Sequence, residues 1–164
     1  MRWLLAGVAL ASVIGQGSGA PGALPYASKP AGRVLNPDQG DRLFFCDAPG
    51  LNVRIKIDSA TTGAKQFAMG TAELSGSNIG THDAEDEIIF IYEGRGRVLV
   101  GDDWFQAEPG TTMYVPHGVK HGFTSDGGSL RFVWVIAPQG LEQRFREGSV
   151  PSLKQCAAAS KGQH

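Results

Sequence analysis

Short apolar runs separated by turn residues fill the chain from Leu43 onward, and they recur at roughly 8- to 12-residue intervals. This rhythm predicts an all-β sandwich or barrel, because each run has the length of one strand. The segment Gly101-Asp102-Asp103 has the composition of a tight hairpin turn between two runs. The expected strands are Leu43–Cys46, Asn52–Asp58, Gln66–Ser75, Ile88–Glu93, Arg97–Val100, Trp104–Ala107, Thr112–Val115, Gly122–Ser125 and Leu130–Ala137.

Two of these strands have apolar residues at both odd and even positions. Residues 88–92 and 132–136 contain almost no polar side chain, so both faces of each strand would be hydrophobic. A strand with one face in water should alternate, so we expect both faces to be covered. One face would line a barrel interior. The other would meet a second sheet, the N-terminal segment or a second subunit, and a homodimer is therefore an expectation.

A helical pattern follows the last strand. Within Gly140–Glu147, Leu141 and Phe145 are four positions apart and would lie on one face of a helix. We therefore expect a short C-terminal helix.

The first residues have the pattern of a secretory signal peptide. Arg2 precedes an uncharged apolar run over residues 3–14, and Ser18-Gly19-Ala20 fits the small-x-small rule for cleavage. The run is shorter than the roughly 20 residues of a spanning helix. We expect a secreted or periplasmic protein with no membrane span after processing; an uncleaved membrane anchor is the alternative. The expected organisation is a signal peptide over residues 1–20, a linker over 21–40, a barrel domain over 41–150 and a flexible tail over 151–164.

Export changes the meaning of the two cysteines. Cys46 and Cys156 can pair in an oxidising compartment, which would tie the tail to the start of the folded domain. Closing so long a loop would contribute on the order of 4 kcal/mol of stability. The alternative is two free thiols. We favour the disulfide.

Length and charge limit the classes of function. The 164 residues suffice for one domain with a substantial core and are too few for two ordinary domains. The formal net charge is -1, and no stretch concentrates Lys or Arg. Nucleic acid is therefore not an expected partner, because phosphate binding needs a cationic face.

Two imidazoles and one carboxylate lie close to turn glycines and predict a single-metal site. These residues are His82, Glu87 and His121. Neutral imidazole and carboxylate suit Fe, Mn, Ni or Zn, and a set of two histidines and one carboxylate leaves coordination positions open. The cofactor predicted from these residues is a divalent transition metal.

The pattern around His121 resembles the second cupin motif, G-x5-P-x-G-x2-H-x3-N. Gly110, Pro116, Gly118 and His121 match its first four fixed positions, and Ser125 stands in place of the asparagine. The chain thus resembles a single-domain, quercetin-dioxygenase-like cupin, from about residue 66 to residue 137. The resemblance implies a jelly-roll (double-stranded β-helix) barrel.

The first cupin motif, G-x5-H-x-H-x3,4-E-x6-G, is matched only in part. Glu87 and Gly94 fit its end, and His82 falls on its second histidine. Gly80 occupies the first histidine position, so one family ligand is missing. The shorter spacing would place Asp83 on the second histidine position. We favour His82, because imidazole is the usual donor there.

The resemblance also implies a class of function. A metal-dependent oxygenase or dioxygenase acting on a small organic molecule is the leading hypothesis, with Glu87 as a metal ligand and proton shuttle. A non-catalytic cupin that binds a sugar or aromatic acid is the alternative, as is an isomerase or lyase on the same barrel. A structural or storage-type barrel is the third hypothesis.

The remaining expectations concern the surroundings of the site. We expect Glu85 and Asp86 to form a solvated acidic loop and His117 to lie at the rim. The candidates for the lining of the cavity are Phe67, Met69, Phe123 and Trp134, and packing in the core is the alternative role for each of them.

Overall fold

The computed structural model of the protein describes residues 32–156. The expected signal peptide (1–20), the first part of the expected linker and the end of the expected tail lie outside these residues. Within them, no helix has both the length and the hydropathy that crossing a membrane requires.

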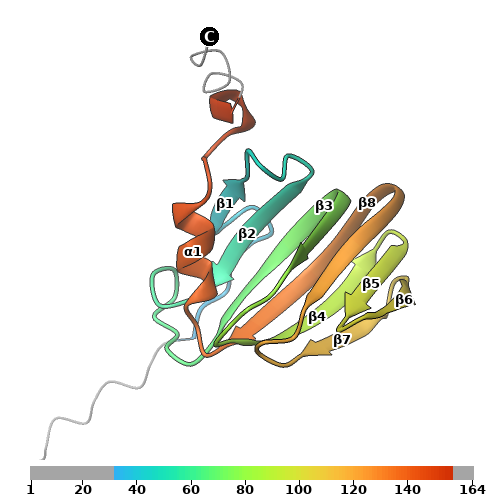
Figure 1. The fold of residues 1–164 in the computed structure, drawn as a ribbon. Helices are drawn as coiled ribbons and strands as arrows, with labels where there is room; N and C mark the ends of the chain where they lie inside the picture. The colour runs from blue at the N-terminus through green and yellow to red at the C-terminus, as the bar shows by residue number, and fades with distance from the viewer. Residues whose placement is uncertain (1–31, 157–164) are drawn as a thin grey trace, which may run out of the picture. The chain divides into compact units, whose positions relative to one another are not determined.

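Within the described residues, eight antiparallel strands and the short helix α1 make up the fold, and residues 153–156 add a further helical turn (Figure 1). They are β1 (Asp41–Phe44), β2 (Leu51–Ile57), β3 (Ala68–Gly80), β4 (Asp86–Glu93), β5 (Gly96–Val100), β6 (Asp103–Ala107), β7 (Thr112–Val115), β8 (His121–Ala137) and α1 (Leu141–Glu147). The predicted all-β class with a short C-terminal helix is confirmed. The predicted hairpin turn is also confirmed, since β5 pairs with β6 on either side of Gly101, which has a φ of 65°.

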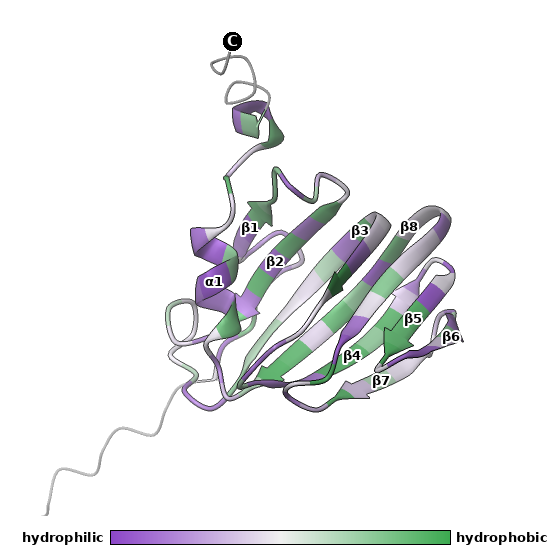
Figure 2. Cartoon of the chain, in the orientation of Figure 1, coloured by the Kyte–Doolittle hydropathy of each residue, from purple (hydrophilic) through white to green (hydrophobic). Residues whose placement is uncertain are grey.

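The strands form one sheet in the order β1-β2-β3-β8-β4-β7, with β5 between β6 and the first half of β8. The two long strands β3 and β8 form the middle of the sheet. β2 pairs with β3, β4 and β5 pair with β8, and the remaining strands pair with these three. Inward and outward residues alternate along β2, as the banding in Figure 2 shows. The inward side chains form one hydrophobic core.

The predicted strands Gly122–Ser125 and Leu130–Ala137 are wrong as separate elements, because β8 runs through both. The Gly-rich stretch between them has the composition of a turn, but β3 continues alongside it. The pairing skips from Ser75 opposite Ser129 to Ser77 opposite Thr124, so one β3 residue faces four β8 residues. This irregularity lets the paired strands change direction without separating.

The outward face of β4 differs from the expectation. Ile88, Phe90 and Tyr92 are between 43% and 48% exposed, and their inward neighbours Ile89 and Ile91 are fully buried. Nothing in residues 32–156 covers that face. The homodimer stays a prediction, and sedimentation equilibrium would test it.

Helix α1 lies beside β1 and β2 (Figure 1) and is fixed by aromatic contacts and ion pairs. Leu141 is buried, and the Phe145 ring packs edge-on against Phe45 and Trp134, which confirms the predicted apolar face. Trp134 in turn lies over Gly70, where any Cβ would overlap its indole ring. The core on this side therefore depends on α1.

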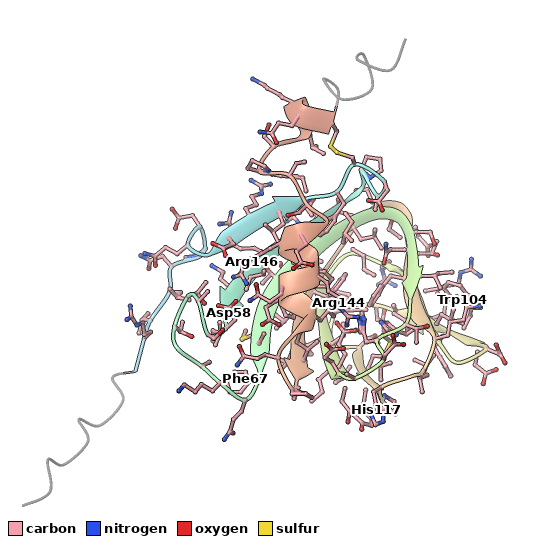
Figure 3. All side chains as sticks on the ribbon, turned by 60° about the vertical axis from the view of Figure 1, so that its left-hand side comes forward. Asp58, Phe67, Trp104, His117, Arg144 and Arg146 are labelled. Carbon is pink, nitrogen blue, oxygen red and sulfur yellow. A yellow bond between two sulfur atoms is a disulfide. The ribbon has the colours of Figure 1, made fainter. Side chains whose placement is uncertain are left out.

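Two cationic side chains of α1 hold the helix in place (Figure 3). Arg146 pairs with Asp58, whose carboxylate is fully buried, at 2.7 Å and with Asp41 at 2.6 Å. Arg144 pairs with Glu85 at 2.8 Å. Both arginines therefore anchor the helix to residues that lie far away in the sequence.

The chain after α1 is tied back covalently. Cys46 and Cys156 form a disulfide across a sequence separation of 110 residues, which Figure 3 draws as a yellow bond. The predicted pairing is confirmed.

Candidate metal centre

His121 is positioned by the start of β8 and by its own ring hydrogen bond. Its side chain is buried, and Nδ1 lies 3.0 Å from the carbonyl oxygen of Val119. Because a carbonyl oxygen only accepts, Nδ1 must carry the proton and donate. When the ring is neutral, the lone pair is therefore on Nε2, which is the arrangement of a metal-ligating histidine.

Glu87 points inward from β4, where the strand alternates between the core and the surface. Its neighbours across the sheet are Val115 and Ile136, both buried. The carboxylate itself is 6% exposed. A buried carboxylate in apolar surroundings needs cationic or hydrogen-bonding partners.

His82 lies in the loop between β3 and β4. The backbone N–H of Gly118 donates to the carbonyl oxygen of His82 at 2.6 Å, which joins this loop to the one that precedes His121. Gly118 has a φ of 76°, a conformation that favours glycine. This backbone bond explains how two loops distant in sequence bring their histidines together.

The three donor atoms converge. His82 Nε2 and His121 Nε2 are 3.2 Å apart, and Glu87 Oε2 lies 3.4 Å from the first and 3.2 Å from the second. These three residues are the group of potential metal ligands found within the described chain.

The donor spacings fit a transition metal. Such ions bind nitrogen and oxygen at about 2.1 Å, so donors at 90° are about 3.0 Å apart and donors at 109° about 3.4 Å apart. All three measured spacings fall within this interval. The donors therefore form one triangular face of a tetrahedral or octahedral site.

Without a cation, the three groups still interact strongly. Burial alone would raise the pKa of Glu87, but hydrogen bonds from His121 and His82 and their charges lower it below its ordinary value. Burial alone would lower the pKa of His121, but the hydrogen bond to Glu87 raises it above its ordinary value. A cation would replace the proton that these groups share.

The preference for His82 over Asp83 agrees with the geometry, because Asp83 is exposed and does not belong to the donor group. Gly80 lies directly opposite His121 in the β3–β8 pairing. Paired residues in a sheet point to the same side, so Gly80 faces the site as the resemblance implies.

The acidic residues beside the site differ from one another. The expectation for Glu85 was wrong: it is buried and paired with Arg144 of α1. Asp86 is half-buried at the start of β4 and accepts hydrogen bonds from the backbone and ring of His117 and from the Tyr114 hydroxyl. The hydrogen bonds from His117 lower the pKa of Asp86 to about 2. His117 lies at the rim, as expected, with its side chain 64% exposed.

A cavity of about 80 Å³ adjoins the donor group. One water needs about 10–15 Å³ on the same measure, so there is room for roughly six waters or a small organic molecule. Its apolar walls come from β2, β3, β8 and α1 and include Val53, Ala72, Phe123, Phe132, Trp134 and Phe145. Phe123 and Trp134 are expected lining residues, whereas Phe67 is exposed and Met69 does not line the cavity.

Sequence reasoning missed six residues of the cavity wall, which are Leu51, Val53, Ala72, Asn78, Phe132 and Phe145. Asn78 follows from alternation alone, because it is two residues before Gly80 on β3 and shares its face. Phe145 carried no local signal, since only the packing of α1 brings it to the cavity.

Comparison with known proteins agrees with this picture. Residues 72–136, which include all three donors, match the family described as a cupin domain. An uncharacterised protein of Streptomyces coelicolor is 38% identical over 55 residues, or 34% of this chain and 52% of that protein. The match thus spans about half the length of the curated relative.

Two solved structures share the fold. KdgF from Halomonas sp. has a TM-score of 0.50 at 17% identity, covering 58% of this chain and 86% of that one. The polyketide cyclase RemF from Streptomyces resistomycificus has a TM-score of 0.53 at 22% identity, covering 66% of this chain and 80% of that one. The family match over residues 72–136 confirms the expected cupin domain, and the two solved structures share its fold.

Proposed function

We propose that this protein is an exported, metal-dependent cupin enzyme of the oxygenase or dioxygenase type that acts on a small organic molecule. The observation that carries the proposal is the convergence of His82, Glu87 and His121 at spacings that suit one cation. The set fits Fe, Mn, Ni or Zn, and it leaves coordination positions free on the side of Gly80. Such an ion would supply Lewis acidity and, for Fe, Mn or Ni, redox chemistry with dioxygen.

The chain's own groups support catalysis in three ways. The Val119 carbonyl fixes the tautomer and orientation of His121. Glu87 Oε1 makes no hydrogen bond within residues 32–156, so this oxygen is free to take up or deliver a proton while Oε2 faces the histidines. The apolar walls formed by Phe123 and Phe132 exclude bulk water from the reacting groups.

Export is supported by the Cys46–Cys156 disulfide, because such bonds persist in oxidising compartments. The alternative function, a non-catalytic binding cupin, is favoured by one observation: Gly80 stands where the family has a fourth ligand.

The test begins with metal content. Mature protein isolated from its own host is analysed for Fe, Mn, Ni and Zn, together with the variants His121→Ala and His117→Ala. We expect about one ion per chain in the wild type and in His117→Ala, and loss of the ion in a folded His121→Ala. His117 is a matched control, since it is a histidine of the same loop that points to solvent.

The second stage separates enzyme from binding protein. Oxygen consumption is measured with small phenolic and enolic compounds on metal-loaded protein. Turnover that is lost in His121→Ala supports the oxygenase. Melting shifts with bound compound but no turnover would support the binding cupin instead, and a wild type that retains no ion after refolding with each metal would exclude both metal-based readings.

A further inference from the structure

We infer that the cavity selects a planar, singly charged chelator, whose two adjacent oxygens bind on the Gly80 side, where one of them also accepts a hydrogen bond from the Asn78 amide. This inference rests on the proposed metal site and adds the class of ligand and a positioning residue. It is carried by the inner face of β3, by the aromatic wall and by the charge of the cavity.

The inner face of β3 provides the open side. Gly80 is opposite His121, and a Cβ built at Gly80 would meet no atom within 4 Å. The space next to the donor triangle is thus open on the one side where a fourth side chain would otherwise reach. Two adjacent oxygens of a ligand would fit this side without displacing any protein donor.

Asn78 is the next inward residue on the same strand. It lies opposite Phe123 and lines the cavity. Its side-chain amide makes no hydrogen bond within the described part of the chain, although its neighbour Ser77 bonds to both Phe123 and Thr124. An amide that faces an otherwise apolar cavity with both its donors and its acceptor free is suited to orient a ligand.

The aromatic wall favours a flat body. Phe123 and Phe132 are stacked at 4.5 Å with an angle of 14° between their rings. Both rings line the cavity beside the donor group, and both belong to β8. A planar ligand would lie along this wall with its polar edge toward Asn78.

The charge of the cavity sets the charge of the ligand. Among the residues that line it, Glu87 is the only one with a formal charge when the histidines are neutral. A divalent ion and one carboxylate leave a net charge of about +1, which one negative charge neutralises. A dianion would leave a charge without a partner in an apolar cavity, because neither Lys nor Arg lines it. The favoured class is therefore the enolates, α-keto acids and hydroxyketones that chelate as monoanions.

The experiment compares two chelating probes, one with a single negative charge and one with two, on metal-loaded, full-length protein. Binding of tropolone at pH 8, a planar monoanionic chelator, is compared by calorimetry with binding of oxalate, a dianionic one. Metal content is measured again afterwards, because a chelator that strips the ion would also produce heat. We expect tropolone to bind at least tenfold more tightly than oxalate, since the second charge of oxalate has no partner.

Variants assign the contact. Asn78→Ala should weaken tropolone binding by about three- to tenfold, the effect of one hydrogen bond. Asn52→Ala, on the outward face of β2, is the matched control and should bind as the wild type does. Gly80→His should retain the ion and lose tropolone binding, because the imidazole fills the open side.

The outcomes separate the two proposals. If the wild type carries no ion, the proposed function fails before the probes are used. If the ion is present and oxalate binds as tightly as tropolone, or Asn78→Ala binds like Asn52→Ala, the inference is overturned while the metal site stands. Tropolone binding that persists unchanged in Gly80→His would overturn the assignment of the open side.

Discussion

Replacing Arg146 by Met tests whether the ion pair beneath α1 holds the cavity wall in place. The Asp58 carboxylate is fully buried; its Oδ1 accepts from the backbone N–H and hydroxyl of Thr61 at 2.7 and 2.8 Å, and its Oδ2 faces Arg146 at 2.7 Å. Methionine keeps the length of the aliphatic stem but removes the guanidinium. Oδ2 then has no partner within residues 32–156.

Removing one partner of a buried ion pair typically costs about 3–5 kcal/mol. The cost should be lower here, about 2–3 kcal/mol, because Thr61 still solvates Oδ1 and Arg146 is 21% exposed, so water can approach the carboxylate. For a domain of this size, that corresponds to a fall in Tm of about 8–12 °C.

The assay is urea unfolding followed by circular dichroism, with Arg95→Met as the control. Arg95 pairs with Glu108 on the surface, where the two side chains are 75% and 62% exposed, so its loss should cost less than about 1 kcal/mol. Asp58→Asn and the double variant complete a cycle, and we expect a coupling of about 1–3 kcal/mol. If Arg146→Met costs no more than Arg95→Met, the buried charge does not depend on α1 and the reasoning is refuted.

Three further predictions concern the site, the disulfide and acid. Gly80→His should slow the loss of metal to EDTA, because the new imidazole projects beside His121 into open space; unchanged or faster loss would contradict the alignment of the first motif. Replacing Cys46 and Cys156 together by Ser should lower the free energy of unfolding by about 4 kcal/mol, because the unfolded chain without the disulfide has more conformational entropy. If the wild type is equally stable in urea with and without reductant, this prediction is wrong. Burial alone would raise the pKa of Asp58, but its hydrogen bonds to Thr61 and Arg146 lower this pKa below the ordinary value of 3.8. The ionised carboxylate therefore stabilises the fold above pH 3.8, and this contribution to stability is lost as the pH falls further. Asp58→Asn should flatten the acid limb of the stability curve.

The donor group could be predicted because residues typical of turns lie next to residues that bind metals in the sequence. The positive φ of Gly118 directs its N–H to the carbonyl oxygen of His82. Strand β8 begins three residues later and positions His121. Such requirements act over a few residues, so they leave a pattern in the sequence.

The contacts of α1 were not predictable in this way. Glu85 was predicted to be a surface residue because its partner, Arg144, is 59 residues away, and nothing in the sequence near either residue indicates that they pair. Asp58 and Arg146 pair across a similar distance. The outward face of β4 is a different case, since its apolar composition was read correctly and nothing within residues 32–156 covers it.

The bond from Gly118 to the carbonyl of His82 places a hydrogen-bonded amide proton three residues before His121. The two loops that it joins each contribute one imidazole, so an ion held between those rings would resist the separation that exposes this amide to solvent. Hydrogen–deuterium exchange at this single position would therefore report occupancy of the centre, independently of substrate, colour or catalysis.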